Sequence, residues 1–140
     1  MKSVYQFDIQ ATADVVDRNG HVNNVVYVQW LQHAAVCHAE DSGCMAATTS
    51  AGASWVVRTH HIEYLAPAFA GDTLTVVTWV ANFQKVRSLR KYKIIRAAGQ
   101  TVVARAETDW VFVNAKTGRP LKIPDEVRIT LPIVDKEMEL

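Results

Sequence analysis

A short polar segment near the N-terminus carries side chains that could do acid–base chemistry. Asp17, Asn19 and His21 follow one another at a spacing of two residues. The pair Asn19-Gly20 is typical of a tight turn, because both residue types tolerate positive φ. A carboxylate or an imidazole held in such a turn can take a proton from water. The segment therefore contains the groups needed for attack on a carbonyl.

The residues after this turn predict a helix that begins at Asn23 or Asn24 and runs to about Glu40, where Ser42-Gly43 would end it. Its wide apolar stripe comprises Val26, Trp30, Ala34 and Cys37 on one face and Tyr27, Leu31, Ala35 and His38 beside it. A stripe of this width predicts a helix wrapped by other elements. Its N-terminus would offer unpaired N–H groups and a partial positive charge to a developing oxyanion.

Alternating apolar and polar residues predict five strands around that helix. The expected strands are 5–12, 55–65, 73–83, 87–97 and 100–114, with a loop of small residues over 46–53 and a short helical turn over 123–126. This order predicts a single α+β domain over 1–140, in which a curved, mostly antiparallel five-stranded sheet wraps a long central helix. One helix cannot cover both faces of such a sheet. The uncovered edges and residues such as Trp79 therefore predict a homodimer or homotetramer.

Length and composition narrow the class of protein. The 140 residues have a formal net charge of +1 and suffice for one domain with a real core. No apolar run is long enough for a membrane span, and the N-terminus lacks a secretory apolar segment. Cys37 and Cys44 are too few and too close for a disulfide scaffold. We therefore expect a cytoplasmic protein that does not act at a membrane.

Basic residues are concentrated in one interval, since no acidic residue lies between Asp72 and Glu107. The seven basic residues there are Lys85, Arg87, Arg90, Lys91, Lys93, Arg96 and Arg105. They could form a solvated strand face or a site for a polyanionic ligand such as a phosphate group. Nucleic acid is the weaker option, because no nucleic-acid-binding motif accompanies them. His33 and Cys37 are spaced four apart on the helix, but no metal-binding pattern is complete, so we expect no metal and no cofactor.

The predicted order, together with the pattern Asp17-x-x-Gly20-x-Val22-x-x-x-x-Tyr27-x-x-Trp30, resembles the hotdog-fold acyl-CoA thioesterases of the hydroxybenzoyl-CoA thioesterase type. The stretch Gly20-His21-Val22-Asn23-Asn24 is also similar to the plant acyl-ACP thioesterases. Further along the chain, Tyr64-x-x-Pro67-x-x-x-Gly71-Asp72 and Gly118-Arg119-Pro120 match such thioesterases. Related dehydratases usually have Gly-His-Phe-Pro where this chain has Gly20-His21-Val22-Asn23.

The resemblance implies roles for individual residues. Asp17 would activate water or attack the thioester directly, and the backbone N–H near Asn24 would stabilise the oxyanion. His21 and Asn19 match the acyl-ACP variant, so either Asp17 or His21 could be the main base. Tyr27 is expected to contribute to substrate binding as a core or pocket-wall residue and not as a reactive group. The residues expected to bind the phosphates of CoA are Lys85, Arg87, Ser88, Arg90 and Lys91.

The sequence thus predicts an enzyme that hydrolyses an acyl or aroyl thioester to the free acid and CoA. Family active sites form at a dimer interface, so each site is expected to face strand residues of the partner subunit. The alternatives are an acyl-ACP thioesterase, another hotdog enzyme such as a dehydratase or hydratase, and a non-catalytic acyl-binding protein. Asp17 distinguishes the last of these, because a binding protein needs the pocket but not the carboxylate.

Overall fold

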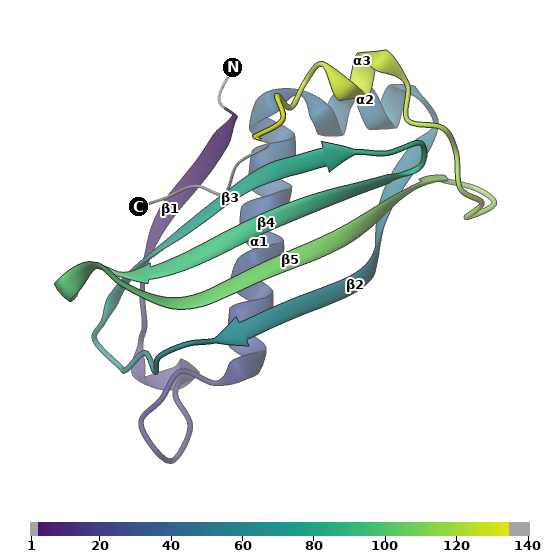
Figure 1. Cartoon of the computed structure of the whole chain (residues 1–140). Helices are drawn as coiled ribbons and strands as arrows, with labels where there is room; N and C mark the ends of the chain where they lie inside the picture. Colours follow the sequence, from purple (N-terminus) through teal and green to yellow (C-terminus); the bar gives the residue numbers. More distant parts are fainter. Residues whose placement is uncertain (1–2, 135–140) are drawn as a thin grey trace.

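Five antiparallel strands curve around one long helix in the computed structural model, which describes residues 3–134 (Figure 1). The strands are β1 (Val4–Gln10), β2 (Ala53–Tyr64), β3 (Thr73–Phe83), β4 (Arg87–Arg96) and β5 (Thr101–Asn114). They lie in the order β1-β3-β4-β5-β2, and every neighbouring pair is antiparallel. The predicted α+β fold class is confirmed, with β1 and β2 as the two edges of the sheet.

Helix α1 (Asn24–Ser42) runs across the concave face of the sheet (Figure 1). Its N-cap is Asn23, whose side-chain oxygen accepts a hydrogen bond from the Val25 N–H at 3.0 Å. Gly43 ends the helix in the left-handed conformation at φ 87°, as expected for a C-terminal glycine. The side chains that α1 buries are Tyr27, Trp30, Leu31, Ala34, Ala35, His38 and Ala39. The predicted helix and most of its buried stripe are therefore confirmed.

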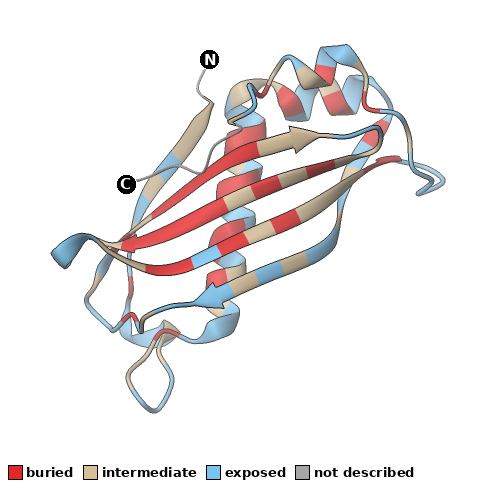
Figure 2. Cartoon of the chain, viewed as in Figure 1, coloured by how far each residue is buried: buried red, intermediate tan, exposed pale blue. Residues whose placement is uncertain are grey.

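The main core lies between α1 and the concave face of the central strands. It includes Leu74 and Val76 from β3, Tyr92 and Ile94 from β4, and Ala104 and Ala106 from β5, packed on Leu31 and Ala34. Figure 2 shows runs of successive buried residues along β3 and β4, whereas buried residues alternate with others along β5 and much of β1 and β2 is exposed or half-buried. Burial on both faces of the central strands makes them the rigid support for α1 and for the turn that precedes it.

The predicted loop over 46–53 is wrong, because a second helix, α2 (Cys44–Ser50), begins directly after Gly43. Its alanines favour a helix, and two of its side chains, Cys44 and Thr48, are buried against the rest of the chain. The Thr48 hydroxyl also accepts a hydrogen bond from the Trp55 indole N–H at 3.0 Å. These tertiary contacts are not visible in a stretch of small residues.

A short helix, α3 (Asp125–Arg128), follows Pro124 and confirms the predicted helical turn. It lies next to α2 at one end of the molecule (Figure 1). Side chains from α3 and the segment after it complete a second apolar cluster there, which includes Cys44, Phe112, Ile123, Val127 and Leu131. This end of the sheet is therefore closed within the chain.

The expectation that Trp79 needs a second subunit to cover it is wrong. Trp79 is only 1% exposed and packs with Val77 and Ile95 on the convex face of the sheet. Val134 packs against this cluster, and its N–H donates to the Val80 carbonyl at 2.9 Å. Val134 therefore covers part of the convex face, and the burial of Trp79 within one chain carries no information about oligomeric state. No helix in residues 3–134 is long and apolar enough to cross a membrane.

Candidate active site

The segment between β1 and α1 folds into the predicted turn. Its base is an antiparallel bridge between Val16 and Val22, and the Asp17 N–H donates to the His21 carbonyl at 2.7 Å. Gly20 takes φ 78°, which a residue with a side chain adopts only with strain. Asp17 Oδ1 accepts from the N–H groups of Asn19 at 2.9 Å and His21 at 3.2 Å. Both hydrogen bonds use the same oxygen, so the described residues leave Oδ2 available.

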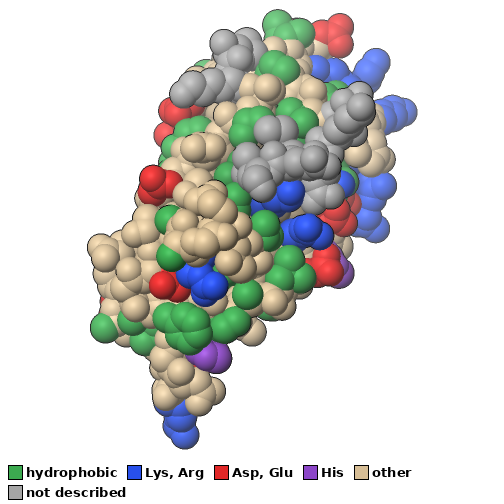
Figure 3. All heavy atoms as spheres, turned by 60° about the vertical axis from the view of Figure 1, so that its left-hand side comes forward, with side chains coloured by type: hydrophobic (Ala, Val, Ile, Leu, Met, Phe, Trp, Pro, Cys, Tyr) green, Lys and Arg blue, Asp and Glu red, His purple; other side chains and the backbone are tan. Residues whose placement is uncertain are grey.

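The His21 side chain lies against a neighbouring loop. Its ring meets the Phe69 ring edge to face, with 5.1 Å between the ring centroids, and the two residues form an isolated bridge. The Val22 N–H donates to the Ala68 carbonyl at 2.8 Å, and the Phe69 N–H donates to Asp72 Oδ2 at 2.8 Å. Figure 3 shows that hydrophobic side chains gather over the lower part of this face of the molecule. The loop before β3 thus fixes the orientation of the imidazole.

The first amides of α1 differ in whether they have a partner. The N-cap Asn23 accepts from two of them, since its side chain binds the Val25 N–H and its carbonyl binds the Val26 N–H at 2.9 Å. The Asn24 N–H makes no hydrogen bond to a described residue. The Asn24 carbonyl accepts from the Tyr64 hydroxyl at 3.1 Å, which joins the end of β2 to the helix. The free donor beside the turn is therefore the amide for which the oxyanion role was expected.

Tyr27 lies beneath this region and not in an open pocket. It is 2% exposed, and its ring packs edge to face on Trp30 and Tyr64. Burial raises the pKa of its hydroxyl. Tyr27 is therefore a core residue that supports the turn. It does not line the apolar cavity between α1, α2 and the sheet, so the single chain gives no support to the expected role in substrate binding.

The turn itself is open to solvent in the single chain. Asp17, Asn19 and Asn24 are exposed, and His21 is half-buried. A base and an oxyanion donor act far more strongly where water is excluded, because charge interactions weaken in a high dielectric. The turn holds the right groups, but one chain alone does not enclose them.

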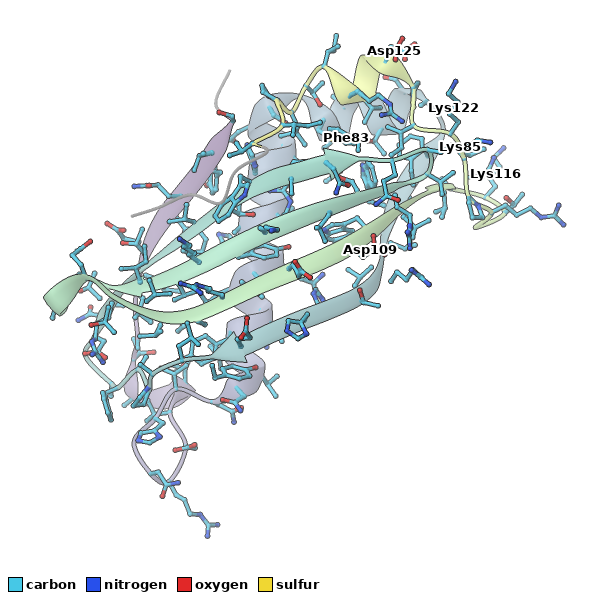
Figure 4. All side chains as sticks on the ribbon, in the orientation of Figure 1. Phe83, Lys85, Asp109, Lys116, Lys122 and Asp125 are labelled. Carbon is cyan, nitrogen blue, oxygen red and sulfur yellow. The ribbon has the colours of Figure 1, made fainter. Side chains whose placement is uncertain are left out.

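The basic residues expected to bind phosphate separate into different environments. Lys85 is exposed in the turn between β3 and β4, and its carbonyl accepts from the Ile123 N–H at 2.9 Å. Figure 4 shows Lys85, Lys116 and Lys122 at the same end of the sheet. The loop that leads into α1 lies at the other end of the molecule (Figure 1). Within one chain, the structure therefore does not bring Lys85 to Asp17.

Arg87 and Lys91 are accessible but already have acidic neighbours. Arg87 Nη1 forms an ion pair with Asp109 Oδ2 at 3.2 Å, and Arg58 pairs with the same oxygen at 3.3 Å. Lys91 lines a charged hollow on the sheet together with Glu63 and Glu107. Ion pairs near the surface are weak, so Arg87 can exchange its partner for a phosphate.

Ser88 and Arg90, which were also expected to bind the phosphates of CoA, are buried in the single chain. Both are 5% exposed, because alternate residues of β4 point inward toward α1. The Ser88 hydroxyl donates to the Asn82 carbonyl at 2.9 Å. Arg90 Nη1 donates to His38 Nδ1 at 2.9 Å and to Thr78 Oγ1 at 3.1 Å.

A cavity of about 330 Å³ lies between α1, α2 and the concave face of the sheet. Its walls are mostly apolar, and Ala35, Ala39, Met45, Trp55, Val80 and Trp110 are among the residues that line it. Arg90 and Ser88 also line it. The volume is at the lower end of the range for small-molecule sites, about 300–1,000 Å³. A largely apolar cavity of this size can hold a small apolar ligand or the apolar part of a larger one.

Known proteins with a similar sequence and fold are thioesterases. The model of the thioesterase-like superfamily matches residues 11–131. The chain belongs to the thioesterase-like superfamily. It is 27% identical to the long-chain acyl-CoA thioesterase FadM of Escherichia coli over 123 residues, which cover 88% of this chain and 93% of FadM. The crystal structure of YbaW, a probable thioesterase from Escherichia coli, superposes with a TM-score of 0.83 at 26% identity and covers 90% of this chain and 95% of YbaW.

A plant acyl-[acyl-carrier-protein] hydrolase, FATB3 of Cuphea viscosissima, is 39% identical to this thioesterase-like protein over 74 residues. That match covers 53% of the chain but only 18% of the plant protein. The chain thus aligns with under a fifth of that relative. The resemblance that the turn motif suggested, and the hotdog fold it implied, are confirmed for this thioesterase-like protein.

Sequence reasoning missed the position of Arg90 in this thioesterase-like protein. The signal was present, because residues 88, 90, 92 and 94 of a strand share one face and Ile94 is plainly a core residue.

Two histidines outside the turn have defined neighbours in the structure. Cys37 Sγ lies 3.5 Å from His33 Nε2, and His60 Nδ1 lies 2.8 Å from Thr108 Oγ1. Among the described residues, no three His, Cys, Asp or Glu side chains come together in a way that could hold a metal ion.

Proposed function

We propose that this protein hydrolyses an acyl thioester of coenzyme A or of acyl carrier protein to the free acid and the thiol, with Asp17 as the base. The observation that carries the proposal is the Asp17 carboxylate, whose Oδ1 is held by two backbone N–H groups while Oδ2 is left for water. The first amide of α1, that of Asn24, follows the turn along the chain and has no hydrogen-bond partner among the described residues. Membership in the thioesterase-like superfamily supports this reaction.

The proposed reaction needs only groups of the turn and the helix start. Asp17 takes a proton from water, and the hydroxide attacks the thioester carbon. The negative charge that develops on the carbonyl oxygen is stabilised by the Asn24 N–H, a type of interaction worth roughly 3 kcal/mol per donor in other enzymes. Collapse breaks the carbon–sulfur bond, and the departing thiolate receives the proton from Asp17. Direct attack by Asp17 would give an anhydride that water then cleaves.

His21 and Asn19 complete the proposed site. The imidazole is fixed against Phe69 and can donate to the substrate carbonyl or assist the base. The alternative assignment, in which His21 is the main base, follows the plant acyl carrier protein hydrolases, to which the chain is similar over 74 residues. The two assignments make opposite predictions for single substitutions.

The exposed turn supports a site completed by a second subunit. Asp17 and Asn24 are exposed in the single chain, so a partner that covers them would exclude water and strengthen both interactions. In such an assembly, Lys85 and Arg87 of the partner could approach the turn and bind the phosphates of CoA. We propose Lys85 with its neighbours Lys116 and Lys122 as the phosphate-binding end of the molecule (Figure 4).

The test is thiol release from short, long and aromatic acyl-CoAs and from acyl carrier protein thioesters. Wild type, Asp17→Asn and His21→Ala are compared on each substrate. We expect Asp17→Asn to lose at least about 100-fold in kcat, the lower range for a general base. A larger loss for His21→Ala would assign the base to His21 and favour carrier-protein substrates. If wild type cleaves no thioester, the proposed hydrolysis is wrong and a binding role remains.

A further inference from the structure

The main cavity contains a cation that its apolar walls do not explain. Arg90 is 5% exposed and lines the cavity together with Ala35, Val80 and Trp110. Lysine and arginine are almost never buried in a core unless a carboxylate or another partner satisfies them. An arginine at this position therefore needs a specific reason.

The partners of Arg90 are both neutral acceptors. Nη1 donates to Thr78 Oγ1 and to His38 Nδ1, and the Thr78 hydroxyl itself donates to the Lys91 carbonyl at 2.9 Å. Because arginine is only a donor, His38 Nδ1 must be an acceptor, and the contact selects the uncharged imidazole. Both contacts use Nη1. The guanidinium has five N–H groups, so Nε and Nη2 retain three donors.

The charge of Arg90 is also unbalanced. Within residues 3–134, no carboxylate lies within ion-pair distance of Arg90. The ion pairs of these residues join Arg58 and Arg87 to Asp109. Burial lowers the pKa of Arg90, which shows how strongly its surroundings disfavour the charge. An arginine stays charged in proteins, so an anion that balances it comes from outside residues 3–134, or the cost stays uncompensated.

We infer that the cavity binds an acyl group carrying a carboxylate, which accepts hydrogen bonds from the free N–H groups of Arg90. The substrate class would then be thioesters of dicarboxylic acids, with the free carboxylate in the cavity and the thioester at the turn. This inference rests on the proposed thioester hydrolysis. A carboxylate matches the fork of a guanidinium and forms the stronger, charge-assisted hydrogen bonds. An unsubstituted alkyl chain would leave the charge unpaired.

The binding test does not depend on hydrolysis. Octanoate and octan-1-ol have the same alkyl body, and the cavity volume corresponds to about ten water-sized groups, so both fit. Binding of each is measured by calorimetry with the wild-type chain. We expect octanoate to bind at least about tenfold more tightly, as charge-assisted hydrogen bonds provide. Equal binding of acid and alcohol would overturn the inference.

Two variants test whether Arg90 is responsible. Arg90→Met keeps an unbranched chain and removes the charge, and we expect it to bind octan-1-ol at least as well as octanoate. Arg119→Met is the matched control, because Arg119 is exposed in the turn after β5 and its loss lowers the net charge of the protein by the same one unit. It should retain the preference for octanoate. If Arg90→Met also retains that preference, the inference is wrong. If Arg90→Met does not fold, the wild-type comparison decides alone.

The hydrolysis test uses matched CoA thioesters of dicarboxylic and monocarboxylic acids. His38, which Arg90 contacts, lies on the order of 20 Å along α1 from Asn24, at about 1.5 Å per residue. Acyl groups of 8, 12 and 16 carbons, each tested as a dicarboxylic and a monocarboxylic thioester, therefore cover the possible distances between Arg90 and a turn of the same chain or of a partner. We expect kcat/KM to favour the dicarboxylic member about tenfold in wild type and not in Arg90→Met. A preference for the monocarboxylic member in wild type would overturn the substrate class, whereas cleavage of neither would refute only the proposed hydrolysis.

Discussion

Asp17 combines a structural and a proposed catalytic role that two substitutions can separate. Its Oδ1 holds the turn through the N–H groups of Asn19 and His21. Asp17→Asn keeps an oxygen acceptor there but removes the charge, so we expect unfolding free energy to change by less than about 0.5 kcal/mol. Asp17→Ala removes the acceptor as well and should cost about 1 kcal/mol. Urea unfolding of both variants measures the difference.

The same two variants also test the catalytic role. Both should lose turnover to a similar extent if the charge of Asp17 is what the reaction needs. Asp17→Asn with wild-type turnover would show that the carboxylate only holds the turn. This comparison separates catalysis from folding, because Asp17→Asn should lower turnover while leaving the free energy of unfolding nearly unchanged.

His60 should make stability depend on pH. Burial lowers its pKa, and Nδ1 lies close to Thr108 Oγ1. The unfolded chain, in which a histidine titrates near about pH 6.5, therefore binds a proton more readily than the folded chain. The stability contributed by neutral His60 is present above that pH and is lost as the pH falls toward the folded-state pKa.

The prediction for His60 is a smaller acid-induced loss of stability in His60→Gln than in wild type. Urea unfolding at pH 7.5 and pH 5.5 gives the two free energies for each protein. His61→Gln is the control, because His61 is adjacent in β2 but exposed. Equal acid sensitivity of wild type and His60→Gln would contradict the prediction.

At the scale of elements, the N-terminal end of α1 is stabilised by its N-cap, Asn23. Asn23 accepts two of the first N–H groups of the helix, with its side chain and its carbonyl. Asn23→Ala removes the side-chain acceptor, and we expect a loss of about 1 kcal/mol in unfolding free energy. Asn24→Ala is the matched control for stability, since the Asn24 side chain caps nothing in the described structure. A thermal or urea transition that is the same for both variants would contradict this assignment.

At the scale of the whole molecule, β2 is the edge that we expect to join two subunits. It is 12 residues long and β1 only 7, and long uncovered edges favour pairing with another chain. Val56 on β2 is 45% exposed and apolar. The exposed turn lies next to the end of β2, because the Tyr64 hydroxyl of that strand donates to the Asn24 carbonyl. A partner that pairs with β2 would therefore lie close to the turn.

The prediction is a dimer or larger assembly by light scattering at micromolar concentration. Val56→Lys should shift the mass toward the monomer and lower turnover together, because the site would lose its cover. Ile129→Lys, at a residue that is 70% exposed beyond α3, should change neither. A monomeric wild type with full activity would refute the shared site.

Local features were predictable from the sequence because they depend on neighbouring residues. Asn19-Gly20 specifies the turn, Asn23 and Gly43 bound the long helix, and β3 was predicted at its observed ends. The same local motif carried the resemblance to thioesterases that the family comparison confirms. Roles of Asp17, His21 and Asn24 remain predictions, since they depend on chemistry that only activity measurements report.

Only the tertiary structure decided which side chains face the interior and what covers them. Val134 packs on the cluster that contains Trp79, α2 replaces a predicted loop, and Arg90 lines the cavity and is shielded from solvent. In each case the deciding contacts join residues that are far apart in the chain. Alternation along a strand limits a side chain to one of two faces, but packing against distant elements determines which face is the core.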